Sequence, residues 1–284
     1  MPNVQFFRTR NAVLPESNRY FCNVLLFHQT KIMSNIGFTS LLHTVTVNSK
    51  DDGERFTDFT RVNSIKSLLA ESDYQLVKEG KLFLLYAKGP LEGKEIVLIS
   101  SHIDCVYSEC FCEEVDEEHF KGTFDNSLTN AAVLFNMLYG LFDDNVVIAF
   151  TGDEEKDSGG CLELIGYLIN QSGCKVRFAL VTDVTNEGWE AECPFSIEND
   201  LGIDLFTAHS IVETLAPFQY NFVHDAEPDE SWDYDGVGMP CLTLCIPVLG
   251  DMHSDEGTLV RKMGIPTYCQ ALRLLANSLS ADEG

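Results

Sequence analysis

The sequence predicts an α/β fold, a three-layer sandwich in which helices cover both faces of a mostly parallel, mixed sheet. Two observations support this prediction. Segments with apolar residues at helical spacing alternate along the chain with short apolar runs. The short runs are continuously apolar, which is typical of parallel strands that are buried on both faces. The expected strands are residues 82–87, 95–101, 146–151, 177–182 and 242–248.

Four segments are expected to form the covering helices. They are residues 57–71, 127–142, 158–170 and 265–280. In the first segment, apolar residues recur three or four positions apart, at Phe59, Val62, Ile65, Leu68 and Leu69. Between the first two strands, Gly89, Pro90 and Gly93 predict a turn.

The chain of 284 residues has no internal repeat and no low-complexity linker, so we expect a single domain over residues 33–284. Residues 1–32 are expected to be a peripheral extension. Their apolar patch at 20–27 is short, is interrupted by Asn23 and lacks a small-residue cleavage site, so it is a poor signal peptide. No apolar run approaches the roughly 18 residues that a membrane span needs.

The overall charge excludes two classes of partner. With 44 acidic and 19 basic residues, the formal net charge is -25, which disfavours binding to nucleic acid or to an anionic membrane. The 10 cysteines are irregularly spaced, which predicts free thiols in a reducing compartment and a cytoplasmic location. Cys105, Cys110 and Cys112 lie close together but form no CxxC pair, so we interpret them as buried or incidental thiols.

Polar residues of the metal-ligand type follow several of the expected strands. They are His102 and Asp104 in SHID, Asp125 in GTFDNS, Glu154 and Glu155 in FTGDEE, Asp183 in VTDV and His253 in DMHSDE. Each has an ordinary explanation alone, such as a helix cap, a turn or a solvated acid. Ligands bind beyond the carboxyl ends of parallel strands, where these residues are expected to meet. Together they suit zinc, or manganese or cobalt.

Hydrolysis of an amide bond explains the composition of this set. It needs an activated water, a polarised carbonyl and a proton donor for the leaving amine, and two metal ions supply the first two. Asp125 suits the bridge between the ions, and each ion then takes one histidine and one further carboxylate. Two divalent ions with Asp125, Glu155 and Asp183 leave one positive charge, which favours a metal-bridging hydroxide. One acid of the adjacent pair would act as base and the other as ligand.

These motifs, in this order, resemble those of the co-catalytic zinc exopeptidases, which include aminopeptidases, carboxypeptidases and aminoacylases. The resemblance extends over roughly residues 56–280, although only the short motifs are specific. It implies two Zn²⁺ ions, with Co²⁺ or Mn²⁺ as alternatives. It implies that His102 and Asp183 hold one ion, that Glu155 and His253 hold the other, and that Asp125 bridges them.

The resemblance also implies that Glu154 is the general base and that the Asp125–Asn126 peptide bond is cis. Asp104, two positions after His102, is placed to accept the second ring N–H of that histidine. The gaps of about 23 residues between His102 and Asp125 and about 70 between Asp183 and His253 are too short for the lid or dimerisation insertions of some relatives. A compact catalytic domain is therefore expected.

The arginine content favours an aminopeptidase acting on a peptide or aminoacyl-amide substrate. A carboxypeptidase or deacylase binds a carboxylate, best with arginine, yet Arg177 is the only arginine between Arg61 and Arg261. Acids that suit a cationic N-terminus cluster around Trp232, either as a pocket rim or as an exposed loop. They are Asp225, Glu227, Asp229, Glu230, Asp233 and Asp235. A carboxypeptidase, a dipeptidase, an N-acyl amino acid deacylase and an inactive binding module stay open as alternatives, as does the oligomeric state.

Overall fold

The computed structural model describes residues 37–49, 55–223 and 226–281. Within them, 11 strands form one sheet, in the order β1-β2-β6-β3-β7-β10-β11-β5-β4, with β8 also paired to β10 and β9 paired to β8. The strands are β1 Gln75–Glu79, β2 Phe83–Ala87, β3 Glu95–His102, β4 Cys112–Glu114, β5 His119–Gly122, β6 Val146–Thr151, β7 Lys175–Thr185, β8 Ser196–Leu201, β9 Asn221–Phe222, β10 Cys241–Leu249 and β11 Thr258–Arg261.

The centre of the sheet is parallel and its edges are antiparallel. Strands β6, β3, β7 and β10 pair in parallel. At one edge β1 and β2 pair antiparallel, and β2 joins β6 in the same sense. At the other edge β11, β5 and β4 form an antiparallel extension of β10. The carboxyl ends of the central strands therefore meet along one side of the sheet.

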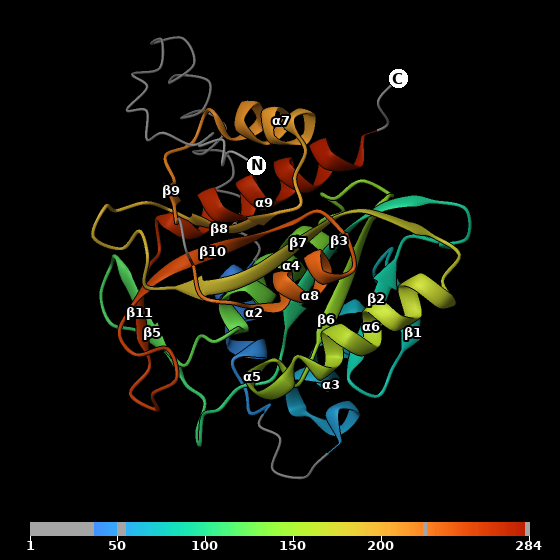
Figure 1. Cartoon of the computed structure of the whole chain (residues 1–284). Coiled ribbons are helices and arrows are strands. Elements are labelled where there is room, and N and C mark those ends of the chain that lie inside the picture. The colour runs from blue at the N-terminus through green and yellow to red at the C-terminus, as the bar shows by residue number, and fades with distance from the viewer. Residues whose placement is uncertain (1–36, 50–54, 224–225, 282–284) are drawn as a thin grey trace.

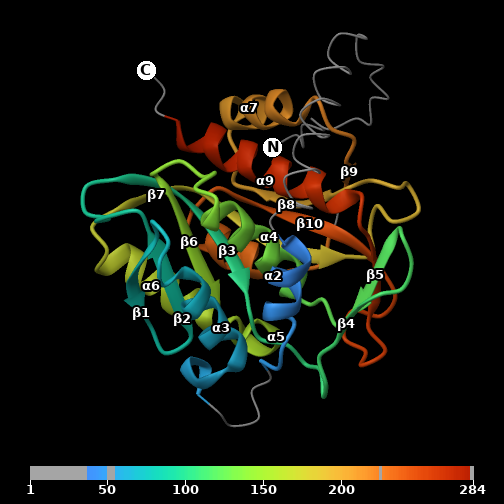
Figure 2. The same ribbon diagram turned by 180° about the vertical axis from the view of Figure 1, so that it is seen from behind.

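Helices cover both faces of this sheet (Figures 1 and 2). One apolar cluster joins the sheet to α2, α3, α4 and α9, and a second joins its opposite face to α6 and α8. Helix α7 packs on the outside of α9. The helices are α2 Phe38–Val45, η1 Phe56–Asp58, α3 Thr60–Leu69, α4 Ser127–Leu138, α5 Glu154–Asp157, α6 Gly159–Asn170, α7 Leu205–Leu215, α8 Glu230–Gly236 and α9 Gly264–Ser280.

Alternation along the central strands explains why their sequences are apolar throughout. In β3, Val97 and Ile99 belong to the first apolar cluster, whereas Ile96 and Leu98 belong to the second. Successive side chains of a strand point to opposite faces, so a strand covered on both faces favours apolar residues at most of its positions. The predicted three-layer α/β sandwich with a mostly parallel sheet is confirmed.

Two predicted helices are shorter than expected. The segment 57–71 divides into η1 and α3 because Phe59 has an extended backbone, with φ -55° and ψ 139°. The segment 127–142 ends as a helix at Leu138, and Gly140 follows in the left-handed region with φ 59°. Glycine adopts that conformation readily, so it ends the helix before the apolar pattern ends.

Other predictions about the organisation of the chain stay predictions. Residues 1–32 lie outside the described residues, so their peripheral role is untested, and the single domain over 33–284 is untested as well. Among the described helices, none combines the length and the apolar character that crossing a membrane requires.

Candidate metal centre

Three neighbouring parallel strands bring predicted site residues to one side of the sheet. His102 is the last residue of β3, and it pairs in register with Thr151, the last residue of β6. Asp183 lies near the end of β7, one position after Thr182, which pairs with Ser101 of β3. Two residues separate β6 from helix α5, which carries Glu154 and Glu155. Strand register therefore places four predicted residues together.

The start of α4 adds Asp125 to this group. The Asp125–Asn126 peptide bond is cis, as the resemblance implied. Asn126 donates a hydrogen bond from Nδ2 to the Thr182 carbonyl (2.6 Å), and Asn130 donates one from Nδ2 to the His102 carbonyl (2.9 Å). Both bonds are buried. They tie the first turn of α4 to the ends of β7 and β3, so the Asp125 carboxylate is held between these strands.

The predicted ligands form two groups that share Asp125. In the first, His102 Nε2 lies 3.3 Å from Asp125 Oδ1 and 3.6 Å from Asp183 Oδ1. In the second, His253 Nε2 lies 3.4 Å from Asp125 Oδ2 and 3.7 Å from Glu155 Oε2. Within each group the potential ligand atoms lie within 4.8 Å of one another. The two oxygens of one carboxylate therefore face two separate clusters of nitrogen and oxygen donors.

The predicted general base lies beside both groups. Glu154 has a potential ligand atom within 4.8 Å of those of His102 and Glu155. Burial, together with the charges of Asp183, Glu230 and Asp125, raises the pKa of Glu154 to about 8 against the opposing effect of His102. The pKa of Glu155 is also raised to about 8, first by burial and then by Asp125. Both carboxyl groups therefore exchange protons near neutral pH in the metal-free chain.

Asp104 lies on the other side of the His102 ring. His102 Nδ1 is 3.5 Å from Asp104 Oδ1, longer than a usual N–H···O hydrogen bond, and neither atom has a hydrogen-bond partner. The second oxygen, Asp104 Oδ2, accepts the backbone N–H of Glu155 at 3.2 Å. Asp104 therefore faces the ring nitrogen that points away from Asp125, and it also contacts the segment that carries the two glutamates. That Asp104 accepts the second ring N–H of His102 stays a prediction.

The donor set fits divalent cations. Glu155 Oε1 is buried and has no hydrogen-bond partner, which is costly unless another group offsets it. Burial opposes protonation of His102, yet Glu154 and the carboxylates around it raise its pKa. Burial raises the pKa of Asp183. This excess of buried negative charge beside two imidazoles is the environment that zinc-type ions favour.

Tyr107 is a site residue that sequence reasoning missed. Its hydroxyl accepts the backbone N–H of Asp125 at 3.2 Å and donates to the carbonyl of Met252, the residue before His253. Burial, followed by the charge of Asp125, raises the pKa of Tyr107 above its usual range. An aromatic residue shortly after the SHID motif was the available signal, although nothing in the sequence placed it against Asp125.

Two further acidic residues lie near the centre: Glu198 was missed by sequence reasoning, and Glu230 was expected only as part of the acidic cluster around Trp232. Glu198, on β8, has a buried Oε1 without a hydrogen-bond partner, and burial raises its pKa to about 7. Glu230 is only 1% exposed and accepts a hydrogen bond from Ser100 Oγ at 2.9 Å. Their neighbours lie far away in the sequence, so no local pattern could have revealed them.

The acidic cluster around Trp232 is not a uniform exposed rim. Glu230 and Tyr234 are buried because α8 turns this face toward the sheet, so the rim interpretation is wrong for Glu230. Asp229 caps α8 by accepting the N–H of Ser231, and Trp232 is 52% exposed. Asp225 lies outside the described residues.

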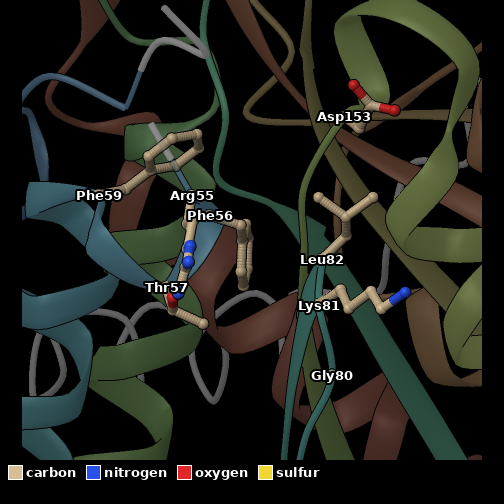
Figure 3. Close-up of a pocket in the computed structure, with 8 residues that line it drawn as sticks. All are labelled: Arg55, Phe56, Thr57, Phe59, Gly80, Lys81, Leu82 and Asp153. Atoms are coloured by element: carbon tan, nitrogen blue, oxygen red, sulfur yellow. The ribbon is translucent and has the colours of Figure 1, made fainter. Parts of the chain in front are cut away.

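A separate cavity of about 520 Å³ lies beside the centre (Figure 3). Arg55, Phe56 and Phe59 lie on one side of it, and Lys81 and Leu82 lie on the other. Asp153, which immediately precedes Glu154, contributes to its lining. None of the predicted site residues lines this cavity, so the candidate centre is defined by the donor geometry at the strand ends.

Solved structures share this fold at low sequence identity. No model of a protein family matches the chain, and no curated protein matches it by sequence. The LapA aminopeptidase of Legionella pneumophila has a TM-score of 0.65 at 12% identity, with 100% of this chain and 81% of that one covered. A TET aminopeptidase of Thaumarchaeota archaeon SCGC AB-539-E09 has a TM-score of 0.67 at 10% identity, with 84% and 96% covered.

A Thermotoga maritima protein described as an endoglucanase is similar as well. Its TM-score is 0.59 at 13% identity, with 84% of this chain and 98% of that chain covered. At such identities the likeness concerns the fold. The chain therefore shares the fold of these aminopeptidases and of the protein described as an endoglucanase, which confirms the predicted resemblance at the level of the fold.

Proposed function

We propose that this chain is a metal-dependent aminopeptidase that releases the N-terminal residue of a peptide. The observation that carries the proposal is the pair of donor groups that share Asp125, each completed by one histidine and one further carboxylate. His102 and Asp183 would hold one cation, and Glu155 and His253 would hold the other. Zn²⁺ suits this mixture of imidazole and carboxylate, with Co²⁺ or Mn²⁺ as alternatives.

When bound, two divalent cations polarise the scissile carbonyl and lower the pKa of the attacking water. Glu154 belongs to neither group that shares Asp125, so its carboxylate is free to take the proton of the water and deliver it to the leaving amine. The raised pKa of Glu154, about 8 through burial, suits such an exchange near neutral pH. Asp104 would hold the His102 ring with Nε2 turned toward Asp125 and Asp183.

Charge around the centre supports the amino end of a peptide as the target. Glu198 lies close enough to Asp183 and Asp229 for their charges to add to the effect of burial on its pKa. This acidic surrounding would attract an ammonium group. Arg177, which a carboxylate-binding enzyme would use, donates to the Ala281 carbonyl from the opposite end of β7.

The fold neighbours agree with peptide hydrolysis. LapA and the TET protein are described as aminopeptidases, whereas the Thermotoga maritima protein is described as an endoglucanase. Hydrolysis of a glycosidic bond typically uses a pair of carboxylates without metal ligands. The two histidines that face Asp125 therefore favour peptide hydrolysis here.

The test is a panel of fluorogenic aminoacyl-amides and their N-acetylated counterparts, assayed with and without a chelator. An aminopeptidase cleaves the free-amine series only, loses activity with the chelator and regains it with Zn²⁺, Co²⁺ or Mn²⁺. Cleavage of the acylated series instead would favour the carboxypeptidase or deacylase alternatives, and free dipeptides test the dipeptidase. Metal binding without any cleavage would favour the inactive binding module.

A further inference from the structure

The cavity of Figure 3 and the acidic region around Glu198 lie on opposite sides of the candidate centre. In the order of the sheet, β2 and β6 come before β3 and β7, which carry His102 and Asp183. The cavity is lined by Leu82, directly before β2, and by Asp153, two positions after the end of β6. Glu198 is on β8, which pairs with β10 on the far side of β7. A peptide whose ammonium group lies near Glu198 would therefore extend across the centre toward the cavity.

The wall of the cavity also contacts the segment that positions the proposed base. Phe56 packs against Gly152 so closely that a Cβ atom there would lie 2.5 Å from the Phe56 ring. The Leu82 carbonyl accepts the N–H of Gly152 at 2.9 Å, and Asp153 and Glu154 follow Gly152 directly. Glu154 would deliver a proton to the leaving amine, so the part of the peptide that follows this amine would lie on the side of Glu154. The cavity is on that side.

The cavity has an apolar floor. Phe56 and Phe59 line it and are 2% and 4% exposed, with ring centroids 5.8 Å apart. Leu82 lies on the other side of the cavity (Figure 3). With a volume of about 520 Å³, the cavity falls within the usual size range of sites for small ligands. It can therefore accommodate an apolar or aromatic side chain.

Two exposed cations, Arg55 and Lys81, belong to opposite sides of the cavity (Figure 3). Within the part of the chain that the structure describes, no salt bridge joins either of them to a carboxylate. Glu163 accepts the backbone N–H of Lys81 at 3.0 Å, and Asp153 in the lining lies 3.9 Å from Lys156. In a chain with a net charge of -25, two such cations beside an apolar floor suit a carboxylate that carries an apolar side chain.

The spacing of the strands indicates which residue of a peptide would reach the cavity. Neighbouring strands lie about 4.8 Å apart, so β2 lies roughly 10 Å from β3, on the far side of β6. An extended chain spans at most about 3.3–3.6 Å per residue, so about three residues would cover that distance. With its first residue at the centre, a peptide of about four residues would therefore place its last residue in the cavity.

We propose that this cavity binds the C-terminal residue of a short peptide substrate. The apolar side chain of that residue packs against Phe56 and Phe59, and its free carboxylate binds Arg55 and the flexible side chain of Lys81. The proposal rests on the proposed function, because it takes the N-terminal residue to be released at the centre. It adds the substrate class, which is peptides of about four residues with a free carboxyl end and an apolar last residue.

The first experiment measures binding and needs no activity. Calorimetry on the full-length chain, with chelator present to prevent cleavage, compares the peptide Gly-Gly-Phe with its C-terminal amide. We expect the free acid to bind about tenfold or more tightly, and Arg55→Gln/Lys81→Gln to remove this difference. The matched control, Lys94→Gln/Lys175→Gln, removes two charges near the opposite ends of the strands and should keep it. No binding of the free acid, equal binding of acid and amide, or unchanged affinity in Arg55→Gln/Lys81→Gln would overturn the proposal.

The second experiment compares the hydrolysis of Leu-Gly-Gly-Phe, its C-terminal amide and a fluorogenic leucyl-amide by the metal-loaded chain. Arg55→Gln/Lys81→Gln should lower kcat/KM for the free acid about tenfold, mainly through KM, and leave the leucyl-amide unchanged because that substrate has no carboxylate. Equal cleavage of acid and amide by the native chain would overturn the proposal and leave the proposed function standing. A chain that cleaves no leucyl-amide would contradict the proposed function instead, and the binding experiment would still test the cavity.

Discussion

The two halves of the candidate centre differ in how they are held. His102 and Asp183 lie at the ends of adjacent central strands, with side chains 4% and 22% exposed. His253 belongs to the loop between β10 and β11, and its side chain is 60% exposed beside Glu155 at 10%. The buried half is positioned by sheet register, whereas the exposed half depends on loop contacts such as that of Tyr107 with Met252.

This difference implies unequal affinity for cations. A preorganised site loses less conformational freedom on binding than a site on a loop does. We therefore expect the His102 half to bind first and the His253 half to bind second and more weakly. Asp125 is the ligand that both halves share, whereas Glu154 acts in the reaction and not in binding the cations. Substitutions at the two residues should therefore differ in their effects on cation binding and on kcat.

The largest effect is expected at the proposed base. Glu154→Gln removes a proton acceptor without removing a ligand of either half, so kcat should fall by roughly 10²–10⁴-fold while both cations stay bound. The neighbouring Glu155→Gln is the matched control, because it should also release the cation of the exposed half. Measurement of kcat and of bound metal on the same samples distinguishes the two variants. Full activity of the Glu154→Gln variant would show that Glu154 is not the general base.

Histidine substitutions compare the halves directly. His253→Ala should abolish the weaker binding step and leave the tighter one, whereas His102→Ala should weaken the tighter step by more than the roughly 10–100-fold expected for an outer-shell residue. Calorimetric titration with Zn²⁺ resolves the two steps. Equal losses at both steps in His253→Ala would mean that the halves do not bind independently.

A smaller effect is expected at Asp104. Asp104→Asn keeps the shape but removes the charge that faces His102 Nδ1, so affinity for the first cation should fall by roughly 10–100-fold. The second step should change less, because Asp104 contacts Glu155 only through its backbone N–H. The same titration provides the measurement, and a change confined to the second step would contradict the proposed role.

The smallest effect concerns pH and the metal-free chain. Burial raises the pKa of Glu154 and Glu155 from 4.5 to about 8, and bonding to Asp125 raises that of His253 from 6.5 to about 9. The folded state then holds more protons than the unfolded state between about pH 5 and 9, so stability falls as pH rises. With chelator present, the melting temperature should drop by a few degrees as the pH rises through this interval. A change of about 1 kcal/mol corresponds to roughly 2–4 °C for a chain of this size class.

Bound cations should reverse this trend, because they require deprotonated ligands. The stabilisation by added Zn²⁺ should therefore grow between pH 6 and pH 8. Thermal unfolding at several pH values, with and without Zn²⁺, makes the measurement. A metal-free chain whose melting temperature rises with pH over this interval would contradict the assignment of raised pKa values to these groups.

The sequence predicted the centre of the fold better than its edges. Continuous apolar runs identified β3, β6, β7 and β10, because burial on both faces favours apolar residues at most positions. The outer strands β1 and β5 are short and partly exposed, so neither contains a continuous apolar run. Strands β4, β8, β9 and β11 were not predicted either, and β5 and β8 also pair with strands far along the chain, which leaves no local signature.

The candidate site shows the same division. All seven predicted residues carry side chains of the ligand or acid–base type at motif positions, and the structure brings them together at one side of the sheet. Glu198 and Tyr107, which were missed, and Glu230, which was expected only as part of the acidic cluster around Trp232, are placed by tertiary contacts. Glu198 is placed by the pairing of β8 with β10, and Glu230 by a hydrogen bond to Ser100, 130 positions away. Tyr107 needed the approach of its loop to Asp125 to become recognisable.

The cation stoichiometry of the purified chain tests the central claim most directly. Metal analysis after reconstitution with Zn²⁺, in the native sequence and in Asp125→Asn, compares the intact centre with one that lacks its shared charged ligand. We predict about two ions per native chain, as expected for a two-metal site, and the loss of both high-affinity ions in Asp125→Asn. A native chain that binds no ion, or an Asp125→Asn variant that binds two as tightly, would contradict a shared metal centre.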